Sequence, residues 1–337
     1  MAKKRYDVIT YGRSSIDLYS NNIGAAFVDI SEFGAFVGGS PLNISVGCAR
    51  LGLKAALITG VGEDQVADFI LNFLKKENVD TRLIPRIKGA RSSAVILGIE
   101  PPDKFPLVYY RDNAADSQVG IDDVIKADIK NCRLLEISAT ALNKEPSRSA
   151  AFFATEEAVS ADVPIVIDLD FRADQWHDPR AFGITTRAIL PRAKIAIGTE
   201  EEILATVLND PEQITIKHQQ ISAPKIKGNI NIGIKTILDL GVEVLVVKRG
   251  ADGCSVFEKG KKEMKVPGFP VEILNILGAG DAFASGYIYG YLKGWDHYKA
   301  ARMGNACGAI VVTRKGCANF MPYEVEVMQF IESKGGF

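Results

Sequence analysis

Short apolar runs alternate with amphipathic, helix-like segments through most of the chain. Each run is followed by turn or capping residues and then by a helical pattern, which is typical of a parallel sheet covered by helices on both faces. The predicted strands are residues 8–11, 55–59, 134–138, 165–168, 195–197 and 244–248. The pattern therefore predicts an α/β fold with a mostly parallel central sheet.

Two segments interrupt this alternation, residues 13–38 and residues 89–112. In the second, strand-like stretches at 92–99 and 107–111 flank a Pro101-Pro102-Asp103 turn. We interpret both segments as a small accessory sheet inserted between β-α units, forming a lid over the edge of the main sheet where such folds bind ligands. The chain is thus predicted to be one domain, residues 1–337, with two lid insertions. The polar, proline-containing stretch 209–231 gives no structural prediction.

Composition narrows the choice of partners. The 40 Lys and Arg residues nearly cancel the 41 Asp and Glu residues, so no overall field favours nucleic acid or an anionic membrane. No stretch of ~20 apolar residues occurs, and Asp7, Gly12 and Arg13 interrupt any apolar signal sequence. The five cysteines are widely spaced without a C-x-x-C pair, which favours reduced thiols in a cytoplasmic protein. A small-molecule partner is expected.

The segment 277–292 joins a turn of small residues to an amphipathic helix. Free backbone N–H groups and the positive end of the helix dipole would make this turn a site for phosphate. Asp281 lies where a carboxylate could take a proton from an alcohol that attacks phosphorus. Alternatively, Asp281 only favours the start of the helix, and the tetrapeptide alone does not separate these two interpretations.

The segment 38–52 begins with two glycines before a second predicted helix. Ser40 is a plausible N-cap, Pro41 a plausible first helical residue and Gly52 a plausible helix end. Asn43 could then offer its side-chain amide to a polyol. Taken alone, the paired glycines indicate only a tight turn.

Together, these two segments resemble the two signatures of the ribokinase-like (PfkB) carbohydrate kinases. The N-terminal match is Gly38-Gly39-Ser40-Pro41-Leu42-Asn43, and the C-terminal match is Gly278-Ala279-Gly280-Asp281. Further matches are Gly12 with Asp17 and the segments 49–52, 60–64, 248–253 and 305–322. The resemblance implies a ribokinase-like three-layer α/β sandwich with a small β-sheet lid, and an enzyme that uses ATP and Mg²⁺.

The resemblance also implies roles for individual residues. Asp281 is expected to be the catalytic base, with an anion hole formed by the backbone of Gly278, Ala279 and Gly280. The residues expected to bind sugar hydroxyls are Asp17, Gly39 and Asn43. The residues expected to contact the nucleotide are Lys248, Gly250, Gly253 and Asn305. Glu201, in the place of the glutamate of an N-x-x-E motif, is expected to organise Mg²⁺ through water.

Departures from the family pattern are informative. Gly198 replaces the asparagine of N-x-x-E, so part of the phosphate and metal network must come from elsewhere. Asn275-Ile276-Leu277 replaces the Asp-Thr pair that commonly precedes Gly-Ala-Gly-Asp, which leaves a monovalent-cation site uncertain.

Two arginines suggest the class of acceptor, because guanidinium forks bind carboxylates in two-pronged fashion. Arg111 and Arg172 are expected near the acceptor, although Arg172 could instead pair with Asp168 or Asp174. Within the family, the segments 110–116, 167–176 and 197–202 resemble the 5-dehydro-2-deoxygluconokinases of myo-inositol breakdown. The resemblance implies phosphorylation of 5-dehydro-2-deoxy-D-gluconate at O6. A kinase for 2-keto-3-deoxygluconate or fructose, and a non-catalytic sensor on the same fold, remain alternatives.

Other enzyme classes lack their motifs in this sequence. No G-x-x-x-x-G-K-[ST] and no G-x-G-x-x-G after the first strand occurs, which argues against Walker-type NTPases and nicotinamide-dependent dehydrogenases. His177, His218 and His297 are scattered and do not suggest a metallohydrolase. Lid strands of the resembled family often pair between subunits, so a homodimer through the lid is a further expectation.

Overall fold

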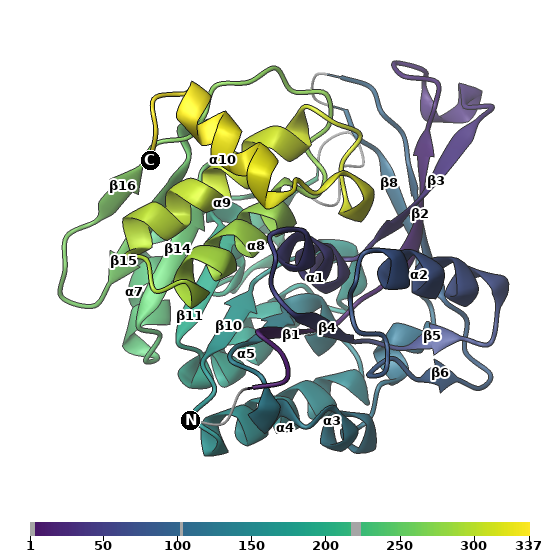
Figure 1. The fold of residues 1–337 in the computed structure, drawn as a ribbon, viewed down its shortest axis with the longest axis horizontal. Helices are drawn as coiled ribbons and strands as arrows, with labels where there is room; N and C mark the ends of the chain where they lie inside the picture. The colour runs from purple at the N-terminus through teal and green to yellow at the C-terminus, as the bar shows by residue number, and fades with distance from the viewer. Residues whose placement is uncertain (1–3, 102–103, 217–223) are drawn as a thin grey trace.

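The central element of the computed structural model, which describes residues 4–101, 104–216 and 224–337, is an eight-stranded sheet. Its strand order is β16-β15-β14-β11-β10-β9-β1-β4, parallel from β14 to β4, with β15 and β16 antiparallel at one edge (Figure 1). The six predicted strands are all present, within two residues of their predicted ends. The strands are β1 (Val8–Tyr11), β4 (Ala55–Ile58), β9 (Leu135–Ser138), β10 (Ile165–Asp168), β11 (Ile195–Thr199), β14 (Val244–Lys248), β15 (Cys254–Glu258) and β16 (Met264–Val266).

Helices cover both faces of this sheet, and each face has its own buried apolar cluster. Together these form the three layers of the expected α/β sandwich (Figure 1). The helices on one face are α1 (Ser40–Arg50), α2 (Gln65–Lys76), α8 (Ala279–Leu292), α9 (His297–Val312) and α10 (Glu324–Ser333). Those on the other are α3 (Ile121–Ala127), α4 (Ser147–Ser160), α5 (Arg180–Ile189), α6 (Glu200–Ala205) and α7 (Ile230–Asp239).

The accessory sheet is also present, as four strands in the order β3-β2-β7-β8 at one side of the molecule (Figure 1). Its strands are β2 (Ser15–Ser20), β3 (Phe33–Gly38), β7 (Ser93–Leu97) and β8 (Leu107–Tyr110). Alternation along β2 buries Asp17 and Tyr19 on the inner face and leaves Ile16 and Leu18 half-buried on the outer face. Of the turn predicted at 101–103, residues 102 and 103 lie outside the described residues.

Two further pairs of short strands lie away from these sheets. β5 (Val61–Gly62) pairs with β6 (Arg86–Ile87) in parallel. Within the stretch that gave no prediction, β12 (Ile214–Thr215) pairs antiparallel with β13 (Lys225–Ile226). Residues 217–223 of that stretch are not among those described.

The start of α1 differs from the prediction. Gly39, not Ser40, is the N-cap, so Ser40 is the first helical residue and Pro41 the second. A φ of +111° and an ideal Cβ position only 2.3 Å from the carbonyl oxygen of Arg13 require glycine at 39. The Ser40 hydroxyl therefore does not cap the helix; it donates to Asp168 Oδ2 at 3.3 Å. At the other end, Gly52 follows the C-cap with a φ of +87°, as predicted.

None of the helices in the described part of the chain combines the length and the apolar character needed to cross a bilayer. The five cysteines are buried free thiols.

Candidate active site

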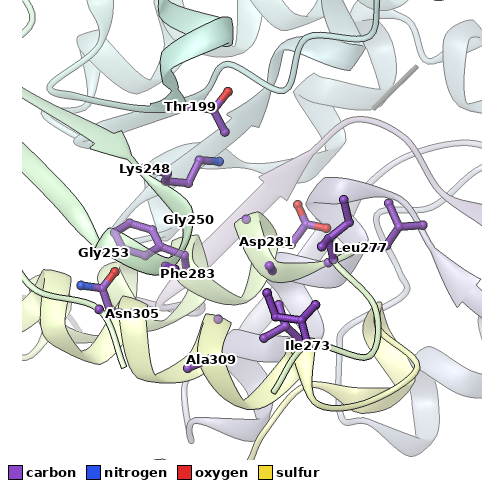
Figure 2. A pocket seen from close by; sticks show the side chains of 18 of the residues that line it. Thr199, Lys248, Gly250, Gly253, Ile273, Leu277, Asp281, Phe283, Asn305 and Ala309 are labelled. Atoms are coloured by element: carbon purple, nitrogen blue, oxygen red, sulfur yellow. The ribbon is translucent and has the colours of Figure 1, made fainter. Parts of the chain in front are cut away.

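A pocket of about 570 Å³ opens at the carboxyl edge of the central sheet. Its walls come from the residues that follow β10, β11 and β14, from the loop 268–277, from the start of α8 and from one side of α9. Figure 2 shows Asp281, Lys248 and Thr199 on one side of this space, with Phe283, Asn305 and Ala309 along α8 and α9. The position agrees with the rule that parallel α/β sheets bind ligands beyond the carboxyl ends of their strands.

Asp281 lies in the first turn of α8 and faces the pocket. Its Oδ2 accepts a 2.6 Å hydrogen bond from Asn43 Nδ2, so the two distant signature segments converge as predicted. Burial raises the pKa of Asp281 and nearby Asp170 raises it further, while the bond from Asn43 lowers it. The carboxylate is therefore held by one neutral donor in a site that resists its charge.

The turn before Asp281 presents backbone donors. Gly278 is the N-cap with a φ of +79°, and a Cβ there would lie 2.6 Å from the Cys317 nitrogen, so only glycine fits. In the described part of the chain, the N–H groups of Gly280 and Asp281 make no backbone hydrogen bond. With the positive end of the α8 dipole, these groups can stabilise an anion in the pocket.

Lys248, the last residue of β14, extends into the same space. Its Nζ lies 3.4 Å from Asp168 Oδ1 and 3.8 Å from Glu202 Oε2. Burial alone would lower the pKa of Lys248, but the two carboxylates raise it above its usual value, so the ammonium stays charged. Burial raises the pKa of Asp168 to about 7, with Lys248 acting in the opposite direction. The charged ammonium group of Lys248 is thus held beside the turn 278–281.

The glutamate that lines the pocket is Glu202, whereas the predicted Glu201 does not line it. β11 continues to Thr199, whose hydroxyl accepts from the Glu202 N–H while Glu202 Oε2 accepts from the Thr199 N–H at 2.7 Å. This capping box turns Glu202 into the pocket. Glu201 points away and pairs with Lys225 at 2.7 Å. Thr199 and Glu202 have the spacing of the N-x-x-E motif, one residue after the predicted Gly198 and Glu201.

The remaining predicted nucleotide residues line the pocket on its far side. Gly250 and Gly253 form the turn after β14, with φ values of +58° and +89°. Asn305 of α9 is buried, and its amide donates to the Pro267 carbonyl at 2.9 Å. The apolar wall at 269–277 was not predicted, because this loop has no periodicity or motif that would identify it.

The predicted sugar ligands lie toward the lid. Asp17 is buried on the inner face of β2, where Oδ1 accepts from Ser15 Oγ at 2.6 Å and Oδ2 from the Tyr19 hydroxyl at 3.1 Å. A Cβ on Gly38 would lie 2.0 Å from Asp17 Oδ2, so the glycine gives this carboxylate its space. Burial raises the pKa of Asp17, and Arg13 lowers it.

The two predicted carboxylate-binding arginines differ in environment. Arg111 is buried outside the pocket, and its Nε and Nη2 donate to Asp116 Oδ2 at 2.8 and 2.5 Å. Arg172 lines the pocket and pairs with Asp170 at 2.5 Å, and not with Asp168 or Asp174. Arg111 is therefore a buried residue whose charge is balanced by Asp116 inside the protein.

Asn275 joins the loop before α8 to the turn after α9. Its side-chain amide donates to the Lys315 carbonyl at 2.5 Å, and its Oδ1 accepts from the Leu277 N–H at 3.1 Å. Asn275 is fully buried. Asn275, which stands where the family commonly has an Asp-Thr pair, is thus a neutral side chain that hydrogen-bonds to the loop before α8 and to the turn after α9.

Comparisons with known proteins agree with this architecture. A model described as "pfkB family carbohydrate kinase" matches residues 6–324. The chain is 34% identical over 334 residues to a 5-dehydro-2-deoxygluconokinase of Clostridium tetani, covering 98% of this chain and 94% of that protein. It is 33% identical over 331 residues to the enzyme of the same name from Geobacillus thermodenitrificans, covering 98% and 94%.

Solved structures share the fold. An Escherichia coli protein described as a ribokinase II, in complex with ATP and Mg²⁺, superposes with a TM-score of 0.83 at 23% identity, covering 97% of this chain and 99% of that one. A fructokinase double mutant of Vibrio cholerae O395, with fructose, ADP and a potassium ion bound, gives a TM-score of 0.79 at 23% identity, covering 98% and 99%. The predicted ribokinase-like sandwich is therefore confirmed.

Proposed function

Because the chain belongs to the pfkB family of carbohydrate kinases, we propose that it transfers the γ-phosphate of ATP to O6 of 5-dehydro-2-deoxy-D-gluconate. This acceptor is a keto sugar acid with a primary hydroxyl, and the reaction belongs to myo-inositol breakdown. The observation that carries the proposal is the 2.6 Å contact between Asn43 and Asp281, which brings the two signature segments to one point of the pocket. Full-length relatives named for this reaction support the choice of acceptor.

The wide side of the pocket suits the nucleotide. Its walls are apolar and its turns are glycines, so an adenine ring and a ribose can lie close to the backbone. The terminal phosphate would then reach the N–H groups of Gly280 and Asp281 and the Lys248 ammonium. The carboxylates of Asp168 and Glu202, both in the pocket, would hold Mg²⁺, directly or through water. Mg²⁺ held by these carboxylates would neutralise charge on the phosphates.

Asp281 serves as the general base in this proposal. Its Oδ2 is fixed by Asn43, which leaves Oδ1 to accept the proton of the acceptor hydroxyl as the oxygen attacks phosphorus. The proton ends on Asp281, and the P–O bond to ADP breaks in line. The protein forms no covalent bond to the phosphoryl group in this proposal, because phosphoryl transfer depends mainly on positioning and charge stabilisation.

The acceptor would lie between the lid and the start of α8. Asp17, Gly39 and Asn43 surround this region and would bind its hydroxyl groups. Arg172 borders the pocket and can approach the acceptor from the side of Asp170. Arg111 instead stabilises the surrounding loop, since Asp116, Gln175 and the Thr140 carbonyl occupy most of its donors.

A coupled ADP-release assay with ribose, fructose, 2-keto-3-deoxygluconate and 5-dehydro-2-deoxygluconate tests the proposal. We expect the highest kcat/KM with 5-dehydro-2-deoxygluconate. A preference for 2-keto-3-deoxygluconate or fructose would assign the chain to one of the alternative kinases. Nucleotide binding without ADP release from any sugar would favour the sensor.

We also propose that two copies pair through the lid. The outer face of the accessory sheet carries Ile16, Leu18 and Ile96, all half-buried, beside Val108 and Tyr110, which are 38% and 58% exposed. An apolar sheet face of this kind is stabilised when a second sheet covers it, and a symmetric partner supplies one. Sedimentation should show a dimer for the wild type and a monomer for Val108→Lys; a wild-type monomer at micromolar concentration would reject the proposal.

The cytoplasm is the proposed location, because it supplies ATP and keeps thiols reduced. The five buried free cysteines agree with a reducing compartment.

A further inference from the structure

We propose that Arg13 binds the carboxylate of the acceptor and thereby sets the preference for an acidic sugar. The inference deepens the proposed function and rests on it. Arg13, which lies just after β1, would thus have the role that the sequence pattern suggests for Arg111 and Arg172. The observation behind it is a buried guanidinium whose carboxylate-binding edge has no partner among the described residues.

Arg13 lies where the acceptor is expected. Arg13 follows the carboxyl end of β1. In the sheet, β9 lies between β1 and β10, and these strands are parallel, so Arg13 lies at the same carboxyl edge as the pocket. Its carbonyl oxygen lies against Gly39, the N-cap of α1. Its guanidinium lies over the ring of Tyr109, in lid strand β8, at 5.1 Å from the ring centre. Arg13 is therefore enclosed between the lid and the sheet, and it is only 7% exposed.

One end of the Arg13 side chain is fixed by the protein. Nη1 donates to Ser15 Oγ at 2.8 Å, and Ser15 in turn donates its hydroxyl proton to Asp17 Oδ1 at 2.6 Å. The hydroxyl thus links Arg13 to the predicted sugar ligand Asp17 without a direct ion pair. The linkage sets the orientation of the guanidinium before any acceptor binds, which lowers the entropy lost on binding.

The opposite edge of the guanidinium is unoccupied by protein. Nε is buried with no hydrogen-bond partner, and Nη2 makes no hydrogen bond to any residue that the structure describes. Nε and Nη2 together form the edge of an arginine that holds both oxygens of a carboxylate. Within the described chain, no carboxylate lies within 4.0 Å of Arg13.

Two other arginines with little exposure show this edge filled. Nε and Nη2 of Arg50 each donate to Glu77 at 2.7 Å. The same two atoms of Arg111 donate to Asp116. A buried guanidinium without such a partner carries a large desolvation cost, and a carboxylate delivered by the ligand would remove it. Arg13 differs from these residues in lying between the lid strand β8 and the N-cap of α1, where the acceptor is proposed to bind.

Arg302 of α9 also has a buried Nε without a hydrogen-bond partner, but its surroundings differ. Its guanidinium lies 3.7 Å from the centre of the Phe269 ring, and Nη1 and Nη2 donate to the carbonyls of Pro267 and Gly336 at 2.7 and 3.2 Å. Arg302 thus fastens the loop after β16 and the end of the chain to α9. It lies on the nucleotide side, away from the lid, so it does not compete with Arg13 for the acceptor.

The geometry at Arg13 also discriminates against neutral sugars. A sugar without a carboxylate would leave the buried Nε and the neighbouring Nη2 without a carboxylate partner, and sites of this type reject ligands that lack the matching group. Arg13 would thus act on the strength of acceptor binding more than on the chemical step at Asp281.

Arg13→Gln tests the inference. We expect the KM for 5-dehydro-2-deoxygluconate to rise by roughly 10²-fold, with the KM for ATP within about twofold of wild type. Residual turnover of D-fructose, which has no carboxylate, should stay within about threefold. The matched variant Arg111→Gln removes an arginine whose edge is already filled; it should lower the melting temperature and leave the ratio of acid to fructose kcat/KM unchanged.

Arg13→Lys keeps the charge and most of the side-chain stem, so it preserves the fold if the glutamine variant does not. It loses the planar fork, and we expect an increase of about tenfold in the same KM. If the wild type fails to phosphorylate 5-dehydro-2-deoxygluconate, the proposed function is wrong. If the wild type accepts this sugar and either Arg13 variant keeps its KM within about threefold, or if only Arg172→Gln raises it, the assignment of Arg13 is wrong.

Discussion

The proposed nucleotide side and the proposed acceptor side of the site differ in the residues that form them. The nucleotide side consists of glycine turns at 250–253 and of apolar side chains from the loop 268–277 and α9. The acceptor side carries charged side chains, among them the half-buried Asp281 and Arg172 of the pocket and the buried Asp17 toward the lid. In the proposed function, one side would therefore recognise its ligand through shape and backbone, and the other through paired and unpaired charges.

This difference indicates which residues determine the specificity for the acceptor. Backbone contacts and apolar walls suit a ligand that every member of a kinase family shares, because they demand only space at certain positions. Buried charges must each find a partner, so changing one of them alters which acceptor is tolerated. Substitutions on the two sides should therefore have separable effects on ATP binding and on acceptor turnover.

The most severe loss should follow removal of the acceptor-side base. Asp281→Asn keeps the shape of the side chain but cannot accept the proton, so turnover should fall by roughly 10²–10⁴-fold. The Kd for ATP, measured by calorimetry, should stay within about threefold, because the nucleotide side is unchanged. Asp68→Asn, which alters a surface carboxylate of α2, provides the control. Turnover of Asp281→Asn within about tenfold of wild type would remove this residue from the mechanism.

On the nucleotide side, two glycines of one turn should respond unequally. A Cβ on Gly253 would lie 2.2 Å from the Val266 carbonyl oxygen, whereas a Cβ on Gly250 meets no atom within 4 Å. Both residues have positive φ, so they share the backbone strain and differ in space. Gly253→Ala should raise the KM for ATP by at least about tenfold and lower the melting temperature, and Gly250→Ala should stay within about threefold. Equal effects would mean that close packing does not shape this turn.

The sequence predicted the central fold well because buried parallel strands are short apolar runs. All six predicted strands of the main sheet appear, and the lid strands lie inside the predicted insertions. Errors arose at element ends, where packing decides. Gly39, and not Ser40, is the N-cap of α1, at a position where a carbonyl oxygen lies too close for a Cβ. Glu202, and not the predicted Glu201, lines the pocket because β11 continues to Thr199.

The acceptor side was harder to predict than the base. Asp281 follows a small-residue turn with a recognisable spacing, and its contact with Asn43 agrees with the two motifs. By contrast, the sequence around an arginine does not show whether its guanidinium pairs with a carboxylate in the folded protein. Arg111 is paired through Asp116, five residues along the chain, and Arg13 is unpaired because the folded lid surrounds it with no carboxylate of the described chain in reach. Only three-dimensional contacts distinguish these two.

A smaller effect should appear at the junction that supports both sides. Asn275 donates to the Lys315 carbonyl, which a carboxylate cannot do, so Asn275→Asp should place two oxygens together and displace the loop before α8. Without monovalent cations, we expect turnover to fall by about tenfold, and added potassium to restore part of it by bridging the oxygens. Asn275→Ala loses the same bond without gaining a ligand and should not respond to potassium. A wild type that requires potassium would contradict this account of Asn275.

The mildest change concerns a buried carboxyl that belongs to neither side. Glu136 of β9 is fully buried, and neither side-chain oxygen has a hydrogen-bond partner in the described chain. Burial raises its pKa well above 4.5, and the charges of Asp168 and Asp281 raise it further. The folded protein therefore keeps this proton at pH values where the unfolded chain has released it. Stability contributed by the neutral carboxyl is present below pH 4.5 and is lost as the pH rises through the raised pKa.

Glu136→Gln removes this titration and should flatten the decline of melting temperature between about pH 5 and pH 8, with the variant roughly 2 °C more stable at the upper end. Glu157→Gln, an exposed residue of α4, should reproduce the wild-type slope. Thermal unfolding across this range gives the answer without any substrate. Parallel curves for wild type and Glu136→Gln would mean that Glu136 releases its proton at the same pH in the folded and unfolded chains, and that the charges of the acceptor side do not raise its pKa in the sheet beneath them.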